Sequence, residues 1–260
     1  MPHPDHEKNR TAWNEMTDVH FKHPDYKVKE FLGGRSTLKS IELDEVGDVN
    51  GKKLLHLMCQ FGLDTLSWAR RGALVTGVDI SDRSIERANE LKEKAGLSAE
   101  FIRCDILDLM GKIDQKFDIV FQSYGTHCWI SDIGRWGQVV VHYLNPGGIF
   151  YMIDDHPIIH IHEVENSSYF DTSAERCSNG RDYCDRSYVI RNELVEWQHT
   201  LSSIINALIK AGLIIEFVNE YDKSYYPMHE NWYEENGYWY PPGGPSPYPL
   251  MFSLRARKQG

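Results

Sequence analysis

Apolar runs and amphipathic segments alternate regularly along residues 52–156. Short runs of apolar and β-branched residues predict buried strands at 52–58, 73–80, 99–106, 117–124 and 149–156. Between them, apolar residues three and four apart predict helices at 64–72, 81–96 and 130–144. Strands that alternate with helices, and that are apolar enough for burial on both faces, are typical of a parallel sheet. We therefore predict an α/β fold with a doubly wound, mainly parallel sheet.

Two regions beside this core lack such a pattern. Residues 1–40 are polar and carry two short predicted helical pieces, at 10–16 and 25–34. Residues 157–198 are polar and aromatic, with candidate strands at 187–190 and 194–197. We expect both regions to lie outside the sheet's regular layers.

Regular elements return after residue 198. Apolar spacing predicts a helix at 199–212 and strands at 213–221 and 250–258. The segment between the two strands, residues 222–248, is rich in Tyr, Trp and Pro. A segment of this length is typical of a functional loop or of disorder, and its aromatic content favours packing. There is no internal repeat, and residues 1–260 are interpreted as a single domain.

Composition and charge narrow the class of protein. The chain has 260 residues, 41% of them hydrophobic, and can bury a sizeable core. Its formal net charge of −10 argues against a nucleic-acid binder and against attraction to an anionic membrane. Five cysteines without a CxxC pair predict no disulfide framework. A polar start and the lack of an apolar run of about 20 residues predict a cytoplasmic protein.

Residues at the carboxyl ends of the predicted strands are the candidate ligand-binding groups, because these ends meet in one crevice of a parallel sheet. The candidates there are Cys59, Gly62, Asp79, Ile80, Asp105, Ile106, Ser123 and Tyr124. Asp79 can accept hydrogen bonds from ribose hydroxyls, or it can cap the next helix, although Ser81 is better placed for that. Asp105 can accept a hydrogen bond from an adenine amine with Ile106 over the ring, or it can be a solvated acid.

The turn after the first strand limits the cofactor, because Gly62 is its only glycine. A dinucleotide needs backbone N–H groups close to its pyrophosphate, and this requirement explains the usual multi-glycine turn. Met58 and Gln60 would crowd such an approach. A cofactor without phosphates does not need such a close approach of the backbone. S-adenosylmethionine, which joins an adenosine to a zwitterionic tail through a sulfonium, suits the pattern.

Residues 54–154 resemble a class I S-adenosylmethionine-dependent methyltransferase. The stretch "LLHLMCQFG" is similar to a first motif of the type "VLDLGCGTG". His56 replaces the strand acid, and Met58 and Gln60 replace two glycines. The stretches "VTGVDIS", "FIRCDILDL", "FDIVFQSYG" and "LNPGGIFYMID" are similar to the later motifs. Together with the C-terminal segments, the whole chain resembles a bacterial branch that methylates small molecules.

The resemblance implies S-adenosylmethionine as cofactor and methyl transfer to a small-molecule acceptor. It also implies a seven-stranded sheet whose last strand is antiparallel beside the sixth, and an N-terminal segment folded over the cofactor. Trp13, His20 and Tyr26 are expected near the methionine end. The expected parts of the domain are an N-terminal cap (1–40), a cofactor-binding core (41–156) and two lid insertions (157–198 and 222–248).

Histidines near the predicted crevice are candidates for a general base or a substrate orienter. His156, His199 and Tyr124 are the predicted catalytic residues, with His127 as a further candidate. His199 can instead be a helix-terminal residue whose hydrogen bonds are satisfied. The histidines after the fifth strand match no metal-ligand spacing, so no metal is predicted.

Large aromatic residues are candidates for the acceptor pocket or for the core. Tyr124, Trp129 and Trp197 are expected to line the pocket. Trp136 has helical spacing with Val139 and Val140 and is expected in the core.

Three other functions stay open. A dinucleotide-dependent oxidoreductase is disfavoured by the missing GxGxxG. A nucleic-acid methyltransferase is disfavoured by the acidic charge and by "QSYG", which stands where an "NPPY"-like tetrad is expected. A non-catalytic or regulatory protein that binds S-adenosylmethionine has no sequence feature against it. The acceptor and the oligomeric state are not readable, and a homodimer is left open.

Overall fold

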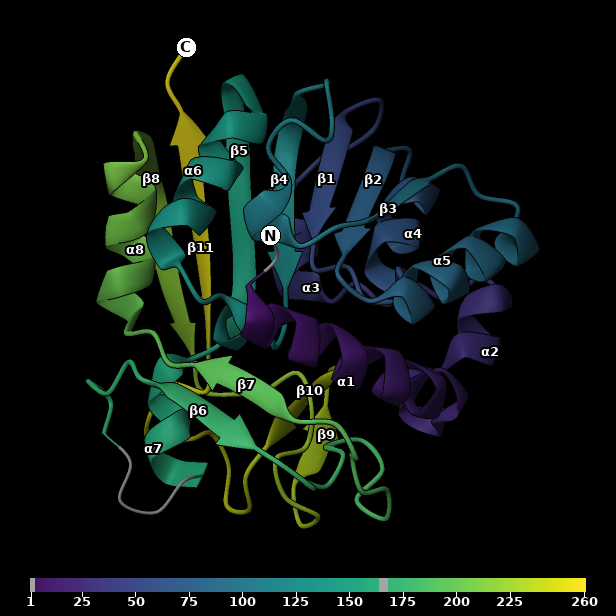
Figure 1. The fold of residues 1–260 in the computed structure, drawn as a ribbon, viewed down its shortest axis with the longest axis vertical. Helices are drawn as coiled ribbons and strands as arrows, with labels where there is room; N and C mark the ends of the chain where they lie inside the picture. The colour runs from purple at the N-terminus through teal and green to yellow at the C-terminus, as the bar shows by residue number, and fades with distance from the viewer. Residues whose placement is uncertain (1–2, 164–167) are drawn as a thin grey trace.

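A seven-stranded sheet forms the centre of the computed structural model, which describes residues 3–163 and 168–260 (Figure 1). Its strands, in the order β3-β2-β1-β4-β5-β11-β8, are β1 (Lys53–Leu57), β2 (Leu74–Asp79), β3 (Glu100–Arg103), β4 (Phe117–Ser123), β5 (Leu144–Asp155), β8 (Leu213–Tyr221) and β11 (Met251–Lys258). Strands β1 to β5 pair in parallel. Strand β11 is antiparallel to both β5 and β8. The predicted fold class is confirmed.

Helices cover both faces of the sheet, because successive side chains of a strand point to opposite faces. The main helices of the core are α3 (Ser40–Val46), α4 (Leu63–Arg70), α5 (Asp82–Ala95), α6 (Ile133–Tyr143) and α8 (Leu201–Lys210). On one face, Leu55 and Val120 belong to a cluster that includes residues of α6 and α8. On the other face, Leu54 and Ile119 cluster with residues of α3 and α4. Trp136 is fully buried on α6, as predicted.

The N-terminal cap begins with α1 (Pro4–Lys22), a single long helix where the sequence predicts a short piece at 10–16. It is continued by η1 (Pro24–Tyr26) and α2 (Val28–Leu32). Most of the residues that α1 buries are polar, so its sequence shows no apolar stripe. Its stability comes from tertiary contacts with α5 and with β7 (Leu194–Trp197). Figure 1 shows α1 crossing the tips of the central strands.

Two insertions lie at the same end of the sheet as α1 (Figure 1). The first insertion (157–198) contains η4 (Pro157–Ile159), α7 (His160–Glu163) and the antiparallel pair β6 (Ala174–Cys177) and β7. The second insertion (222–248) contains the antiparallel pair β9 (Tyr233–Glu235) and β10 (Tyr238–Tyr240).

The predicted strand at 194–197 is confirmed as β7, whereas the predicted strand at 187–190 is wrong. Val189 makes only an isolated bridge with Arg181. Tyr188 and Ile190 pack against the cap instead, so the apolar character of this run serves a loop contact and not a sheet.

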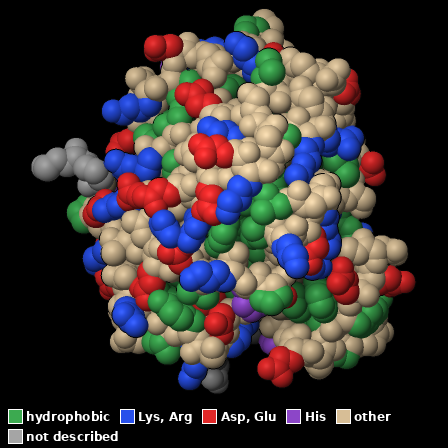
Figure 2. All heavy atoms as spheres, turned by 90° about the vertical axis from the view of Figure 1, so that its right-hand side faces the viewer, with side chains coloured by type: hydrophobic (Ala, Val, Ile, Leu, Met, Phe, Trp, Pro, Cys, Tyr) green, Lys and Arg blue, Asp and Glu red, His purple; other side chains and the backbone are tan. Residues whose placement is uncertain are grey.

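Acidic and basic side chains are interspersed over the face shown in Figure 2. Ion pairs of this kind join α1 to α5, where Asp18 accepts from Arg83 at 2.9 Å and from Arg87 at 2.7 Å. On this face the excess of acidic residues is therefore not gathered into one patch. Among the helices of the described residues, none has the length and apolar character that crossing a membrane requires.

Candidate functional site

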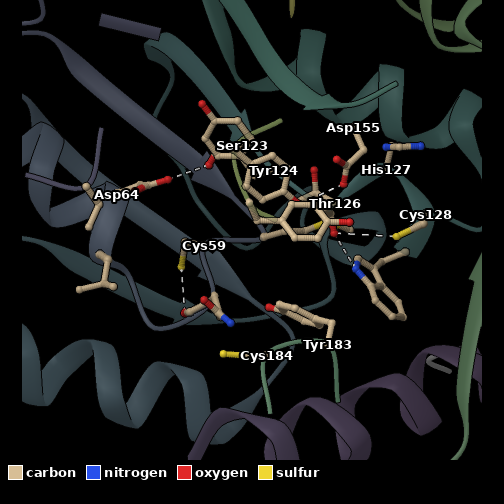
Figure 3. A pocket seen from close by; sticks show the side chains of 18 of the residues that line it. Cys59, Asp64, Ser123, Tyr124, Thr126, His127, Cys128, Asp155, Tyr183 and Cys184 are labelled. Carbon is tan, nitrogen blue, oxygen red and sulfur yellow. Dashed lines mark hydrogen bonds between the residues drawn. The ribbon is translucent and has the colours of Figure 1, made fainter. Parts of the chain in front are cut away.

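A cavity of about 860 Å³ lies at the carboxyl ends of β1, β2 and β4 (Figure 3). Its wall combines these strand ends with residues of the cap and of both insertions. The wall includes these residues of the predicted site: Trp13, Tyr26, Cys59, Asp79, Ile80, Asp105, Ile106, Ser123, Tyr124, Trp129, His127 and His156. Four predicted residues, His20, Gly62, Trp197 and His199, are not part of the wall. The structure thus brings most of the predicted site together.

Asp79 is the last residue of β2 and is buried at the cavity wall. Its two oxygens accept hydrogen bonds from the backbone N–H groups of Gln60 and Ser81, each at 2.8 Å. Burial raises the pKa of Asp79 to about 6. Ser81 caps α5, because its Oγ accepts the N–H of Ser84. Asp79 is therefore not needed as the cap, and it ties the turn after β1 to the end of β2.

The turn after β1 keeps a left-handed backbone without the glycines that usually provide it. Met58 has φ 55° and Gln60 has φ 49°. Such a conformation costs a non-glycine residue about 1–2 kcal/mol and persists only where the surroundings hold it. The Gln60 side chain is held by the cap, since its amide nitrogen lies 3.0 Å from the Tyr26 hydroxyl and 3.2 Å from His20 Nδ1.

Gly62 begins α4 with φ 78° and serves packing rather than the cavity. A Cβ at this position would lie 2.6 Å from the ring of Phe101 and 3.2 Å from the Cβ of Ala88. The turn can therefore rest on β3 and α5 only if this residue has no side chain.

Asp105, directly after β3, is paired rather than solvated. Its Oδ2 lies 2.5 Å from Nδ1 of His6 on α1, and Nε2 of the same ring lies 2.6 Å from the Ser131 hydroxyl. Trp197, which was predicted to line the pocket, lies outside the wall and packs edge-on against His6, with ring centres 5.4 Å apart. The cap thus reaches the acid that was predicted to bind adenine.

His20 joins the cap to the first insertion. It is fully buried, and its Nε2 lies 2.7 Å from Asp182 Oδ2, while its Nδ1 lies 3.1 Å from the Tyr26 hydroxyl. Tyr26 also contacts the hydroxyl of Tyr183 at 2.5 Å, and both tyrosines are on the cavity wall. His20 therefore acts on the cavity through the residues that it positions.

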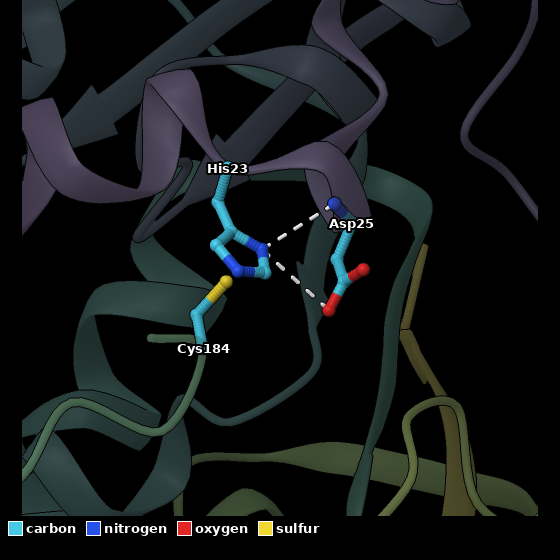
Figure 4. Close-up of side chains that lie close together, drawn as sticks. All are labelled: His23, Asp25 and Cys184. Atoms are coloured by element: carbon cyan, nitrogen blue, oxygen red, sulfur yellow. Dashed lines mark hydrogen bonds and ion pairs between the residues drawn. The ribbon is translucent and has the colours of Figure 1, made fainter. Parts of the chain in front are cut away.

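A second contact between cap and insertion involves His23, Asp25 and Cys184 (Figure 4). Within the described ranges, these residues form a group whose potential metal-ligand atoms lie within 4.8 Å of one another. Burial and neighbouring acids raise the pKa of the Cys184 thiol to about 12, so without a metal it is protonated at neutral pH. We assign no metal to this group.

His127 and Asp154 form a buried imidazole–carboxylate pair beside the cavity. His127 Nδ1 lies 3.1 Å from Asp154 Oδ2, and the backbone N–H groups of residues 125–127 also donate to this carboxylate. Burial alone lowers the pKa of His127, but the Asp154 charge outweighs it, so that the pKa is raised. The same attraction outweighs burial at Asp154 and lowers its pKa. The charge of an ionised Asp154 beside Nδ1 favours the proton on that nitrogen, although the contact lacks hydrogen-bond geometry, and Nε2 is then the basic nitrogen.

The hydrogen-bond geometry and the lowered pKa values of His156 and His199 both argue against these residues as the base. His156 is on the wall, but its Nδ1 accepts from the N–H of Ile158 and its Nε2 lies 2.9 Å from Glu220. His199 Nε2 lies 2.7 Å from the carbonyl oxygen of Ile130. Burial lowers the pKa of both rings, that of His199 to about 4. The contact with Ile130 fits the alternative prediction for His199, namely a helix-terminal residue whose hydrogen bonds are satisfied.

Aromatic side chains line the acceptor side of the cavity. Tyr124 has φ 40° and stacks on Tyr225 with ring centres 4.3 Å apart. Its hydroxyl donates to Glu42 at 2.9 Å, and burial raises its pKa, so it stays protonated. Trp129 donates from Nε1 to the carbonyl oxygen of Gly125. These contacts leave ring faces, not acidic or basic atoms, toward a ligand.

Comparison with known proteins places the core in a family. Residues 54–148 match a family model described as a methyltransferase domain. Solved S-adenosylmethionine-dependent methyltransferases from Mesorhizobium loti and Clostridium acetobutylicum share this fold. The first is 22% identical, with a TM-score of 0.55 and 83% and 94% of the two chains covered. The second is 14% identical, with a TM-score of 0.58 and 95% and 99% covered.

Residues 54–148 are therefore a methyltransferase domain, and the chain has the fold of solved S-adenosylmethionine-dependent methyltransferases. These matches agree with the predicted cofactor and enzyme class. Curated relatives are named ubiquinone biosynthesis O-methyltransferases. One, from Saccharophagus degradans, is 32% identical over 83 residues, which is 32% of this chain and 35% of the relative. Another, from Coxiella burnetii, is 35% identical over 72 residues, 28% and 30% of the two chains. The chain spans about a third of the length of these relatives.

Sequence reasoning missed several residues of this methyltransferase site. His6 and Asp182 lie in polar segments with no periodic signal, so nothing in the sequence marked them. Asp154 had a usable signal, because it directly follows the apolar run at 149–153 near the end of β5. A fully buried carboxylate needs partners, and this one finds them in residues 125–127.

Proposed function

We propose that this methyltransferase transfers the methyl group of S-adenosylmethionine to a hydroxyl group of a small acceptor bound in the cavity. The observation that carries most weight is the position of Asp79. It is a buried carboxylate at the tip of β2, on the wall of the cavity. The chain runs outward from β1 through β2 to β3 and, in the other direction, from β4 to β5. The switch point, where open α/β sheets bind ligands, therefore lies between β1 and β4, beside β2.

The residues on the β2 and β3 side fit the adenosine part of the cofactor. We infer that Asp79 accepts hydrogen bonds from the ribose hydroxyls and that Asp105 accepts one from the adenine amine beside Ile106. Met58 and Gln60 have left-handed backbones, so the turn keeps the shape of a glycine-rich one. The side chains of Met58 and Gln60 would crowd a pyrophosphate at this turn, so the site fits a phosphate-free nucleoside better.

We assign the rest of the predicted cofactor set by position. Ile80, Cys59, Trp13 and Ser123 lie on the wall around the adenosine and tail. His20 and Gly62 act indirectly. His20 positions Tyr26 of the cap, and Gly62 lets the turn after β1 pack against Phe101. When bound, S-adenosylmethionine supplies an electrophilic methyl group on a sulfonium.

His127 is the proposed general base. Its Nε2 takes the proton of the acceptor hydroxyl, while Asp154 holds the ring and stabilises the imidazolium that forms. Positioned bases of this kind contribute about 10²- to 10⁴-fold to a rate. The matched relatives are O-methyltransferases, which also favours an oxygen acceptor. The faces of Tyr124 and Trp129 favour an acceptor with an apolar or aromatic part.

The cap and the two insertions are proposed to exclude water. They supply much of the cavity wall, and His20 with Asp182 holds cap and first insertion together. A closed, dry cavity strengthens the interaction of His127 with Asp154 and keeps the reactants in line.

Two measurements test the proposed function. Calorimetry with S-adenosylmethionine and with NAD should show binding of the first alone. Mass spectrometry with a panel of phenols and aliphatic alcohols should then show a product heavier by one methylene with at least one acceptor. Binding of NAD instead would contradict the cofactor, and methylation only of amines or thiols would contradict the oxygen acceptor.

A further inference from the structure

The amino-acid tail of the proposed cofactor is a zwitterion, so its ammonium needs an anionic or accepting partner in the site. The first strand of this chain carries no carboxylate side chain. There, His56 is buried with Nδ1 2.8 Å from the Thr65 hydroxyl. Burial lowers the pKa of His56 to about 4, so the ring is neutral at physiological pH. A neutral imidazole cannot balance an ammonium, and the charge has to come from elsewhere.

Asp64 is a carboxylate in the first turn of α4 and on the cavity wall. Its Oδ1 accepts from the Thr37 hydroxyl at 2.5 Å, and its Oδ2 accepts from the Ser123 hydroxyl at 3.0 Å. Figure 3 shows the Asp64 side chain directed toward Ser123. A carboxylate has about four acceptor positions, so two neutral donors leave capacity for a further one. The charge of Asp64 is not neutralised by either hydroxyl.

The position of Asp64 matches the path of a bound tail. Ribose is assigned to Asp79 at the tip of β2, and Ser123 ends β4, with β1 between the two strands. Two strand spacings, about 10 Å, separate the tips of β2 and β4. A ligand that has its ribose on Asp79 and extends across the tip of β1 therefore brings its far end to the Asp64–Ser123 pair.

We propose that Asp64 anchors the ammonium of the cofactor's amino-acid tail, with Thr37 and Ser123 holding the carboxylate in place. This proposal rests on the proposed function and assigns a binding residue within it. Asp64 thereby supplies the negative charge that the first strand, with His56, does not.

The test pairs one variant with one ligand change. Wild-type and Asp64→Asn proteins are titrated calorimetrically with S-adenosylhomocysteine and with its deamino analogue, which keeps the carboxylate and lacks only the ammonium. Asp64→Asn should weaken the binding of S-adenosylhomocysteine about 10- to 100-fold, which is the range for a lost charge-assisted hydrogen bond. The deamino analogue should bind the wild type weakly, and its affinity should fall by less than about threefold further in the variant.

Asp44→Asn is the matched control, because it removes an exposed carboxylate of α3 that is not on the cavity wall and should leave both affinities within about twofold. Asparagine can still accept from Thr37 or Ser123, and a thermal scan without ligand reports whether the variant stays folded. An equal loss for both ligands, or no loss for either, would overturn the role of Asp64 and leave the proposed function intact. Failure of the wild type to bind S-adenosylhomocysteine would overturn the proposed function and this inference with it.

Discussion

At the scale of single residues, the site depends on titratable groups whose surroundings set their charge. Asp79 is buried and has a pKa raised to about 6, whereas Asp154 is buried beside His127 and has a lowered pKa. The difference arises because Asp79 accepts only neutral backbone donors, while Asp154 also faces an imidazole that can carry charge. The first carboxylate therefore suits neutral hydroxyl donors of a ligand, and the second suits a proton-transfer role.

The pKa of Asp79 predicts how cofactor binding depends on pH. Ribose hydroxyls donate to the ionised carboxylate, so a proton on Asp79 competes with the ligand. Above pH about 6 the affinity for S-adenosylhomocysteine should be constant. Below it, the affinity should fall by up to about tenfold per pH unit. Calorimetric titrations between pH 5 and about 8 measure this.

Asp79→Asn should weaken the binding of S-adenosylhomocysteine about 10- to 100-fold. It should also remove the pH dependence of this affinity, because the titrating group is gone. Asp108→Asn, at an exposed acid after β3, is the control and should change neither. A pH dependence that persists in Asp79→Asn would assign it to another group.

His127 predicts the pH profile of catalysis. Only the neutral ring can accept a proton, and the pKa of His127 is raised, so kcat should rise with pH through a value above the usual one for histidine. His127→Gln should lower kcat about 10²- to 10⁴-fold while the affinity for S-adenosylhomocysteine changes little. His142→Gln, on α6 and outside the cavity wall, should keep both kcat and its pH profile. An unchanged kcat in His127→Gln would exclude His127 as the base.

At the scale of elements, the turn between β1 and α4 shows how one loop satisfies two demands. Its left-handed residues Met58 and Gln60 have room for side chains, because Met58 packs against the core cluster and Gln60 contacts Tyr26 and His20. Gly62 does not, because a ring of β3 lies directly against it. A left-handed backbone alone therefore does not require glycine, and close packing does.

Alanine substitutions separate these two costs. Gly62→Ala combines a left-handed backbone with overpacking against Phe101 and should lower the free energy of unfolding by about 2–4 kcal/mol. Gly96→Ala, at φ 63° with no atom within 4 Å of the new Cβ, should lower it by about 1–2 kcal/mol. Urea unfolding of both variants measures the difference. Equal losses would mean that the Phe101 ring moves aside without cost.

At the scale of the whole molecule, the cavity wall is built by segments that are far apart in the sequence. His6 meets Asp105 across 99 residues, and His20 meets Asp182 across 162. Each pair joins the cap to another part of the chain, the first to the core and the second to the first insertion. The cavity is therefore a property of the assembled fold and not of any one segment.

Asp182→Asn tests the contact between cap and first insertion. Removing the charge from a fully buried pair should loosen both segments, and hydrogen exchange at residues 174–197 should quicken at least tenfold without ligand. Asp185→Asn is the control, because the Asp185 side chain bonds to Ser187 in its own loop. Unchanged exchange in Asp182→Asn would show that other contacts hold the insertion.

The amino-acid sequence by itself determined the order of strands and helices, the crevice at the strand ends and the residues placed there. These features follow from local periodicity and from the fixed geometry of parallel sheets, which is why Asp79, Asp105 and Ser123 were found in advance. Only the tertiary structure decided which partner each of these groups has. His127, not His156 or His199, received a buried carboxylate, and α1 formed although its buried face is polar. Such pairings depend on contacts between distant segments, and local patterns in a single sequence carry no record of them.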